Sequence, residues 1–449
     1  MVDSRAIFKA YDIRGTYPDQ LDERIARAVG SAFASFVKAP RIVVARDMRP
    51  SGETLSMAFA EGARAVGVAV VDLGLASTDF LYFASGHLDA PGAMFTASHN
   101  PARYNGIKLC LAGAKPVGVD TGLAQIEQMA SAFWREPANG ELAALEQRDL
   151  MDEWVRHVHS FVDLGALRPL KIVADTANGM GGYIAPKIFD GLPFELEIMY
   201  QELDGTFPNH PADPLNPENL RDLQARVLET GADIGLAFDG DADRVFLIDE
   251  KAQPISGSTT TAMVASAMLR RNPGATILYN LICSKSVPAV ITEAGGVPVR
   301  TRVGHSYIKQ TMAETNAVFG GEHSGHYYYR DNYRADSGII TALIVLELLS
   351  GAQIALSELA RPFKRFAASG EINTEVADPA AVVASLTRRL KDEGVNVDEL
   401  DGLSADFESW WFNLRPSNTE PLLRLNVEAA TDELCAAHVR DVLTMIKGA

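Results

Sequence analysis

The sequence predicts an α/β protein in which three similar doubly wound α/β domains precede a smaller α+β C-terminal domain. Three observations carry this prediction. Short apolar runs typical of buried strands, such as Arg41–Ala45, Lys171–Asp175 and Thr276–Tyr279, alternate with helical stretches, and this alternation indicates parallel βαβ units. The length of 449 residues suggests three or four domains at roughly 100 to 200 residues each. After Arg361 the alternation gives way to a different pattern.

We divide the chain at residues 145, 250 and 365. In 1–145, a strand at 68–73 follows a helix from about Glu53 to Val66 that Ser51 can cap. The second domain, 146–250, contains a Gly-rich turn at 176–182 that we interpret as structural, because a lone turn of this kind is a weak phosphate signal. The third domain, 251–365, adds a helix near 307–314 and a long apolar helix over 337–349. For 366–449 we expect strands at 371–376, 407–415 and 422–427 and helices at 379–391 and 432–445.

The composition excludes several classes of protein. A formal charge of −17 argues against binding to nucleic acid or to anionic membranes. The three cysteines are too few and too widely spaced for a disulfide framework or a zinc site. No signal peptide is visible, and the most apolar run, 339–349, is shorter than the roughly 20 residues that span a bilayer. We expect a cytoplasmic enzyme that is a monomer or dimer.

A polar stretch, Thr96–Pro101, interrupts apolar sequence directly after the expected strand Gly92–Phe95. A serine on such a strand-to-loop turn can present its hydroxyl at the carboxyl end of a sheet, where open α/β folds bind ligands. Ser98 is therefore our candidate phosphate carrier. The alternative is that Ser98 or Thr96 only closes a turn or caps a helix.

Alternating carboxylates at Asp239, Asp241 and Asp243 form a second polar stretch. Three such oxygen ligands suit Mg²⁺, and without a cation the carboxylates would repel one another. An EF-hand is the rival interpretation. We reject it because Arg244 stands where the calcium loop needs glycine and because both flanks, 233–238 and 245–249, are typical of strands.

Six motifs together resemble the α-D-phosphohexomutases, in particular the phosphomannomutase/phosphoglucomutase group. They are Tyr11–Gly15, Thr96–Pro101, Asn105–Lys108, Asp239–Arg244, Gly321–His326 and Arg415–Pro421. The resemblance implies four domains around a central cleft lined by one loop from each. It also implies reversible phosphoryl transfer between the 1- and 6-positions of mannose and glucose phosphates, with a phosphoserine, Mg²⁺ and hexose 1,6-bisphosphate as intermediate and activator. Phosphoglucosamine mutase is the nearest alternative within the family.

The resemblance assigns the reacting groups. A phosphoserine oxygen at Ser98 joins the three aspartates as a metal ligand, and Arg244 pairs with that phosphate. Lys108, in the expected turn at 105–108, is the general acid or base if neighbouring arginines lower its pKa, and otherwise a phosphate-pairing cation. His305 is the second candidate for proton transfer.

Substrate-binding residues follow in the same way. Glu322, Ser324 and His326 are expected at the sugar, together with Lys285. His323 departs from the methionine expected at its position, and a zinc site at His323 and His326 lacks a third ligand. A loop of donors anchors the phosphate that does not react: Arg415, Ser417, Asn418, Thr419 and Arg424. The resemblance also brings Tyr11 and Arg14 near the active site, whereas their pattern alone predicts an edge strand over 7–13.

Two rival functions use parts of the same residue set. A Mg²⁺-dependent sugar phosphatase would need Ser98 and the aspartates but no second phosphate anchor. A sugar-phosphate sensor without activity would keep the loop at Arg415 and lose the carrier. The intact Ser98 and all three aspartates speak against the sensor.

Overall fold

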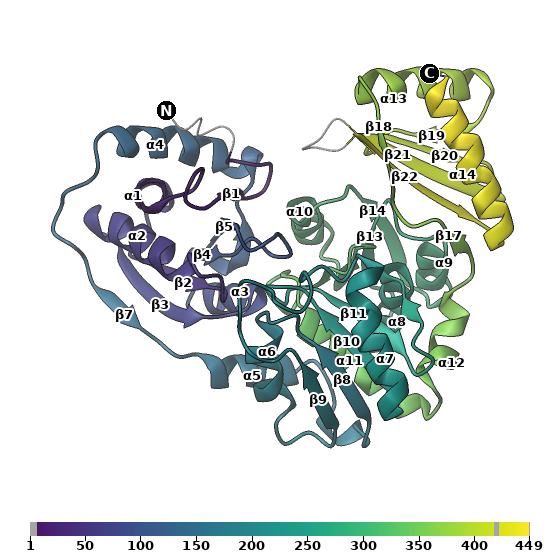
Figure 1. Cartoon of the computed structure of the whole chain (residues 1–449), viewed down its shortest axis with the longest axis horizontal. Helices are drawn as coiled ribbons and strands as arrows, with labels where there is room; N and C mark the ends of the chain where they lie inside the picture. The colour runs from purple at the N-terminus through teal and green to yellow at the C-terminus, as the bar shows by residue number, and fades with distance from the viewer. Residues whose placement is uncertain (1–6, 417–421, 449) are drawn as a thin grey trace. The chain divides into compact units, whose positions relative to one another are not determined.

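The structure, a computed structural model, describes residues 7–416 and 422–448. It divides into two compact units; Figure 1 labels the helices and strands and colours them by residue number. Unit 1 comprises Met1–Ile255 with Ser324–Leu359, and unit 2 comprises Ser256–His323 with Ala360–Ala449. The division at 145, 250 and 365 is finer than this and stays a prediction.

The first sheet of unit 1 is seven-stranded, and helices pack on both of its faces. Its elements are β1 (Ile13–Thr16), α1 (Glu23–Val37), β2 (Arg41–Arg46), α2 (Gly52–Ala65), β3 (Ala69–Leu75), α3 (Thr78–His87), β4 (Gly92–Phe95), β5 (Tyr104–Leu111), β6 (Lys115–Pro116), α4 (Leu123–Arg135) and β7 (Leu145–Gln147). The strand order is β1-β5-β4-β2-β3-β7, with β6 paired to β5. Figure 1 shows α1 and α2 on one side of β2 to β4 and α3 on the other.

Side chains of the central strands alternate between these two helical layers. Ile42 and Val44 of β2 pack into the core beneath α1, α2 and α4. Val43 and Ala45 therefore point to the opposite face. The sheet is mixed, whereas we expected a parallel one, because β5 runs antiparallel to both β4 and β1. A short connection forces this arrangement, since parallel strands need a crossover of a dozen or more residues.

Three local expectations in this sheet are wrong. Asn105–Lys108 is part of strand β5, not a turn. The edge strand expected over 7–13 is only a bridge between Phe8 and Ile13, and β1 starts at Ile13. Ser51 precedes α2 but makes no side-chain cap, because its backbone is helical, at φ −83° and ψ −5°, whereas a capping residue is extended. Its hydroxyl instead accepts a hydrogen bond from Asn105 Nδ2 at 2.8 Å.

The second sheet of unit 1 is five-stranded, in the order β12-β11-β10-β8-β9. Its strands and the other helices and strands of this region are α5 (Met151–His159), β8 (Lys171–Asp175), α6 (Gly181–Phe189), β9 (Glu195–Met199), α7 (Arg221–Thr230), β10 (Ile234–Phe238), β11 (Val245–Asp249), β12 (Pro254–Ile255), β16 (Tyr327–Tyr329), α11 (Gly338–Ala352) and α12 (Leu356–Ala360). Strands β8, β9 and β10 are parallel as predicted, and β11 turns back antiparallel to β10.

Helix α11 is apolar on nearly all sides because it is buried along most of its length. In the described part of the chain, no single helix is both long and apolar enough to cross a bilayer. The bent pair formed by α11 and the following segment Leu356–Phe363 meets the length and composition criteria only when both are counted together.

Unit 2 begins with a parallel arrangement in which β13 pairs with β14 and β15. It continues with an antiparallel sheet, β17-β22-β21-β20-β19, in which β18 also pairs with β22. The elements are α8 (Gly257–Arg271), β13 (Thr276–Asn280), α9 (Ser286–Glu293), β14 (Val297–Thr301), α10 (His305–Thr315), β15 (Phe319–Gly321), β17 (Ala367–Ala368), β18 (Ile372–Glu375), α13 (Pro379–Asp392), β19 (Asn396–Asp398), β20 (Leu403–Asp406), β21 (Trp410–Pro416), β22 (Leu422–Ala429) and α14 (Asp432–Lys447).

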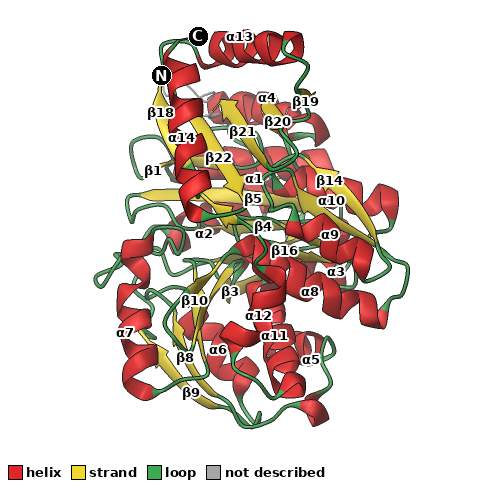
Figure 2. Ribbon diagram, turned by 90° about the vertical axis from the view of Figure 1, so that its right-hand side faces the viewer, coloured by secondary structure: helices red, strands yellow, loops and turns green. Residues whose placement is uncertain are grey.

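The antiparallel sheet of unit 2 forms a two-layer α+β structure with α13 and α14 (Figure 2). Leu386 and Leu390 of α13 and Val442 and Ile446 of α14 share one core with the sheet residues. The sequence predicted three strands here, but the described residues of this region form six. The three that were missed, β17, β19 and β20, are two to four residues long and lack runs of β-branched residues, so no pattern marks them.

Candidate active site

Ser98 lies in the loop between the antiparallel strands β4 and β5. Its backbone has a φ of 51°, a left-handed conformation that is uncommon for a residue other than glycine. The Ser98 amide donates to Thr96 Oγ1 at 2.9 Å and fixes this turn. The side chain, which is only 6% exposed, donates to Asp239 Oδ2 at 2.9 Å. The predicted carrier thus touches the first predicted metal ligand, 141 residues further along the chain.

Arg49 holds the Ser98 loop from behind. Its guanidinium donates to the backbone oxygens of Ser98 at 2.8 Å, Asn100 at 2.6 Å, Pro101 at 3.0 Å and Tyr104 at 2.9 Å. Its Nε donates to Asp47 Oδ2 at 3.2 Å, and both side chains of this ion pair are fully buried. Five donors in a rigid fork therefore fix the path of a strained loop.

The aspartate loop connects β10 to β11, and Phe238 faces Val245 across its base. Ala242 has a φ of 59°, which turns the backbone so that alternate carboxylates converge. Ligand oxygens of Asp239, Asp241 and Asp243 lie within 4.8 Å of one another. Behind the loop, Met180 N donates to Gly240 O at 2.9 Å. The Gly-rich turn at 176–182 therefore supports the aspartates.

Two cations lie among these carboxylates. Lys108 Nζ donates to Asp241 Oδ2 and to Asp243 Oδ2, both at 2.7 Å, and Arg244 Nε donates to Asp239 Oδ2 at 2.8 Å. Burial would lower the pKa of Lys108, but Asp241 and Asp243 outweigh it and raise the pKa well above its ordinary value. The lowered pKa expected from neighbouring arginines is thus not found, since the neighbours of this ammonium are aspartates.

The aspartates fit a metal ion. Oδ1 of Asp241 is buried and has no hydrogen-bond partner among residues 7–416 and 422–448. Burial would raise the pKa of Asp241, but Lys108 and the hydroxyl of Thr78 lower it, which keeps the carboxylate ionised. A buried carboxylate oxygen without a partner, in a cluster of three aspartates, suits a hard divalent cation.

Two further residues, Arg14 and Arg244, contact the Ser98 loop through their guanidinium groups. Arg14 donates through Nη1 to Asn100 Oδ1 at 2.5 Å and pairs with Asp12 through Nη2. Arg244 Nη2 lies 2.7 Å from His99 Nδ1. Burial, Arg244 and Arg14 all lower the pKa of His99, so its ring is neutral and accepts this hydrogen bond. Tyr11 lies half-buried in the bend before β1.

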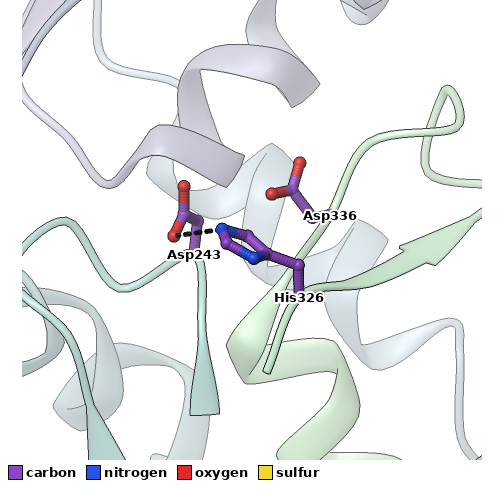
Figure 3. A group of neighbouring side chains, drawn as sticks. All are labelled: Asp243, His326 and Asp336. Atoms are coloured by element: carbon purple, nitrogen blue, oxygen red, sulfur yellow. Dashed lines mark ion pairs between the residues drawn. The ribbon is translucent and has the colours of Figure 1, made fainter. Parts of the chain in front are cut away.

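His326 lies beside the aspartate loop, between two carboxylates (Figure 3). Its Nε2 is 3.8 Å from Asp243 Oδ1, and Asp336 completes a group whose ligand atoms all lie within 4.8 Å of one another. Ser324 Oγ lies 3.1 Å from His326 Nδ1. The predicted sugar ligand Ser324 therefore holds the ring of another predicted sugar ligand.

In unit 2, the predicted sugar residues Glu322 and Lys285 are both engaged by protein groups. Glu322 is buried, and its Oε1 accepts from Asn280 Nδ2 and from Gly304 N, each at 3.2 Å. Lys285 Nζ donates to Asp406 Oδ1 at 2.6 Å. His323, which stands where methionine was expected, has a protein partner as well, because its Nδ1 lies 3.0 Å from Ser258 Oγ, within hydrogen-bond distance.

The two predicted phosphate-anchor arginines of unit 2 share one carboxylate. Arg415 Nη2 donates to Glu371 Oε2 at 3.0 Å, and Arg424 Nη1 lies 3.5 Å from Glu371 Oε1. The strands bring them together because Arg415 of β21 and Arg424 of β22 are opposite each other in the register. The other predicted anchor residues, Ser417, Asn418 and Thr419, lie outside the described residues, as does the side chain of His305 at the start of α10.

Comparison with known proteins identifies the family. Four sequence models described as phosphoglucomutase/phosphomannomutase match the chain: alpha/beta/alpha domain I over residues 5–133, domain II over 152–253, domain III over 256–366 and the C-terminal domain over 371–444. A phosphomannomutase of Salmonella montevideo is 42% identical over 448 residues, which cover 98% of each chain. The chain belongs to the phosphoglucomutase/phosphomannomutase family.

Other relatives agree with this assignment. The phosphohexose mutases of Xanthomonas campestris pv. campestris are 42% identical over 446 residues, covering 98% of this chain and 99% of theirs. The crystal structure of a phosphoglucomutase/phosphomannomutase family protein from Burkholderia thailandensis superposes with a TM-score of 0.89 at 34% identity, covering 100% of this chain and 98% of that one. The predicted fold class and family are confirmed, and this phosphohexomutase is an intramolecular phosphotransferase.

Several residues that support the mutase site were missed by sequence reasoning. Thr78 at the start of α3 donates through Oγ1 to Asp241 Oδ2 at 2.5 Å and through its amide to Asp241 O at 3.1 Å. Next to it, the buried Asp79 accepts hydrogen bonds from Ser77 and, at 2.6 Å, from Ser337 at the start of α11. A run of Ser, Thr and Asp in a buried helix start is the only sequence signal for them, and ordinary capping explains such a run equally well.

Proposed function

We propose that this phosphohexomutase interconverts hexose 1-phosphates and hexose 6-phosphates, with mannose and glucose phosphates as substrates. The reaction would pass through a phosphoserine at Ser98 and a hexose 1,6-bisphosphate. The observation that carries this proposal is the hydrogen bond of 2.9 Å from Ser98 Oγ to Asp239, beside both Lys108 and Arg244. Phosphoryl transfer is catalysed mainly by positioning and by neutralising oxygen charge, which such a cluster provides.

Each half of the reaction makes and breaks one P–O bond. The free hydroxyl oxygen of the sugar attacks the phosphorus of phospho-Ser98 and loses its proton to a base. The bond from phosphorus to Ser98 Oγ breaks, and this oxygen gains a proton. The bisphosphate then turns around, and the same changes run in reverse at the other end of the sugar, so that Ser98 regains a phosphoryl group.

Three groups are candidates for the proton transfer. Lys108 and His305 follow from the family resemblance. His326 joins them, because its imidazole lies 3.8 Å from Asp243 Oδ1, beside the aspartate loop. Lys108 holds its proton firmly, as its raised pKa indicates, so it suits the role of a charge partner better than that of a proton donor or acceptor.

Asp239, Asp241, Asp243 and a phosphoserine oxygen of Ser98 would hold Mg²⁺. When bound, the ion would neutralise developing charge on the transferred phosphoryl oxygens. Arg244 would pair with the same phosphate. Lys285, Glu322, Ser324 and His326 would contact the sugar, and Arg415 and Arg424 would anchor its second phosphate.

The test is phosphorus NMR of the purified protein with Mg²⁺, a trace of glucose 1,6-bisphosphate, and mannose, glucose or glucosamine 1-phosphate in separate tubes. We expect 6-phosphates from mannose and glucose substrates. Conversion should stop in Ser98→Ala and after removal of Mg²⁺ with EDTA. Mass spectrometry should find one phosphate on Ser98 of the wild-type protein.

Other outcomes would decide against parts of the proposal. Conversion of glucosamine 1-phosphate alone would identify a phosphoglucosamine mutase instead. Release of inorganic phosphate without a 6-phosphate product would identify a phosphatase, and in that case Arg415→Ala should leave turnover intact. Full activity of Ser98→Ala would refute the phosphoserine.

A further inference from the structure

Lys285 is tied to a distant part of unit 2 by three hydrogen bonds. The residue precedes helix α9, and its partners are Asp406, Glu408 and Glu428, which lie 121, 123 and 143 residues further along the chain. Its side chain nevertheless remains 32% exposed. The lysine is thus held by protein contacts while part of its side chain remains accessible to solvent.

The turn between β20 and β21 binds the ammonium. Asp406 Oδ1 accepts from Lys285 Nζ at 2.6 Å and also from Glu408 N at 2.9 Å. Glu408 has a φ of 67°, and its carbonyl oxygen lies 3.5 Å from the same Nζ. One carboxylate oxygen therefore fixes both the strained turn and the lysine head group.

Glu428 fixes the backbone of Lys285. It is 3% exposed, and its Oε1 accepts from Lys285 N at 3.0 Å and from Trp411 Nε1 at 2.8 Å. Trp411 and Glu428 are directly opposite each other in strands β21 and β22. Among the described residues, no cation pairs with this buried carboxylate, which makes it costly to retain, and its acceptor oxygen holds two donors from different elements.

A pocket of about 240 Å³ lies beside these contacts. Lys285, Asp406 and Trp411 line it, together with Tyr279 of β13. A second charged pair, Arg300 of β14 with Asp398 of β19, lines the same pocket and does not involve Lys285. Two ion pairs therefore line the pocket. The Arg300–Asp398 pair serves as a control for the Lys285–Asp406 pair.

We propose that Asp406 and Glu428 are positioning residues that set where Lys285 meets the sugar phosphate. The proposal rests on the proposed function, in which Lys285 contacts the sugar. A lysine side chain has much rotamer freedom to lose on binding, and a carboxylate that already holds Nζ removes most of that cost. Glu428 does the same for the backbone from which the side chain starts.

This arrangement couples two binding events. Asp406 lies opposite Trp411 of β21, the strand that carries Arg415, and Glu428 shares strand β22 with Arg424. A shift of the β21–β22 pair on phosphate capture would therefore be passed on to Lys285. Sugar and phosphate recognition in unit 2 thus depend on one another.

The test measures mannose 1-phosphate binding by isothermal titration calorimetry in the Ser98→Ala background, in which no turnover occurs. Lys285→Met removes the ammonium that would contact the sugar, and Asp406→Asn removes the charge that holds this ammonium in place. Each variant should therefore weaken binding about tenfold. The double variant should be no weaker than Lys285→Met alone, because Asp406 acts only through the lysine. Asp398→Asn, the matched control, should bind like its parent.

Glu428 is tested by a conservative pair of variants. Glu428→Gln keeps the acceptor oxygen and should bind normally, whereas Glu428→Ala should weaken binding. If Glu428→Ala does not fold, Asp406→Asn and its double variant still decide the matter.

Normal binding by Asp406→Asn would overturn the inference but not the proposed function. The same holds if the binding free energies lost in Lys285→Met and Asp406→Asn add up in the double variant. Equal losses in Asp398→Asn and Asp406→Asn would also overturn it, because they would indicate a general loosening of unit 2. Absence of both turnover in the wild type and binding in Ser98→Ala would refute the proposed function and the inference with it.

Discussion

Gly240 is the point at which the aspartate loop touches the Ser98 loop, so an added methyl group there should separate the two loops. A Cβ at Gly240 would lie 2.5 Å from the backbone oxygen of Ser98, whereas ordinary contact begins at 3.4 Å. The difference, 3.4 minus 2.5, means that the loops must move apart by 0.9 Å. Since a misplacement of about 1 Å can cost on the order of 100-fold in rate, we expect kcat of Gly240→Ala to fall by that order.

The assay is conversion of mannose 1-phosphate to the 6-phosphate, combined with thermal unfolding. Overpacking of this kind costs about 1–3 kcal/mol of stability, which leaves a protein of this size folded at 25 °C. Gly351→Ala in α11 is the control, because a Cβ there meets nothing within 4 Å. A folded Gly240→Ala protein with wild-type kcat would refute the claim that close contact between these loops sets the rate.

Two further predictions concern stability. Arg49→Lys replaces five donors by three, so at least two buried acceptors lose a partner and the free energy of unfolding should fall by about 2–5 kcal/mol. Urea unfolding measures this loss, with Arg46→Lys at a surface ion pair as the control. A loss below about 1 kcal/mol in Arg49→Lys would contradict the prediction. Burial outweighs two serine hydrogen bonds and raises the pKa of Asp79 from 3.8 to about 7. The stability contributed by the protonated form of Asp79 is therefore complete below pH 3.8 and is lost as the pH rises toward 7. Asn cannot ionise, so the free energy of unfolding of Asp79→Asn should rise relative to that of the wild type by on the order of 4 kcal/mol between pH 4 and 8. A pH-independent difference in unfolding free energy would refute this.

Local patterns were sufficient for the parts of the site that lie on one short segment. The strands on either side of the aspartates are five-residue apolar runs, and the structure has them as β10 and β11. The strand before Ser98 is likewise β4, as expected. Such runs are buried on both faces, so their hydrophobicity alone marks them. The polar loops between them then follow from the strand ends.

Contacts between residues far apart along the chain could not be predicted from the sequence. Arg49 was ambiguous because nothing in its own neighbourhood shows that it will reach carbonyl groups 49 to 55 residues away. Asp336 was not considered, because its proximity to His326 depends on the fold and on no sequence motif. The direction of two strands was also predicted incorrectly, because β5 and β11 run antiparallel to the strands before them. Loops too short for a crossover force this direction, but the alternation of strands and helices in the sequence suggested parallel strands.

Internal ion pairs occupy the groups that the proposed mechanism assigns to ligands. Lys108 lies between Asp241 and Asp243, and the guanidinium groups of Arg415 and Arg424 share Glu371. A cation that binds the aspartates competes with the ammonium of Lys108, and a phosphate that binds the arginines competes with a carboxylate. Binding is therefore an exchange of partners, and its free energy is the difference between two strong interactions. Such an exchange gives the aspartates and the two arginines a partner both before and after binding, so it suits a site whose substrate must leave and return in a second orientation within one reaction.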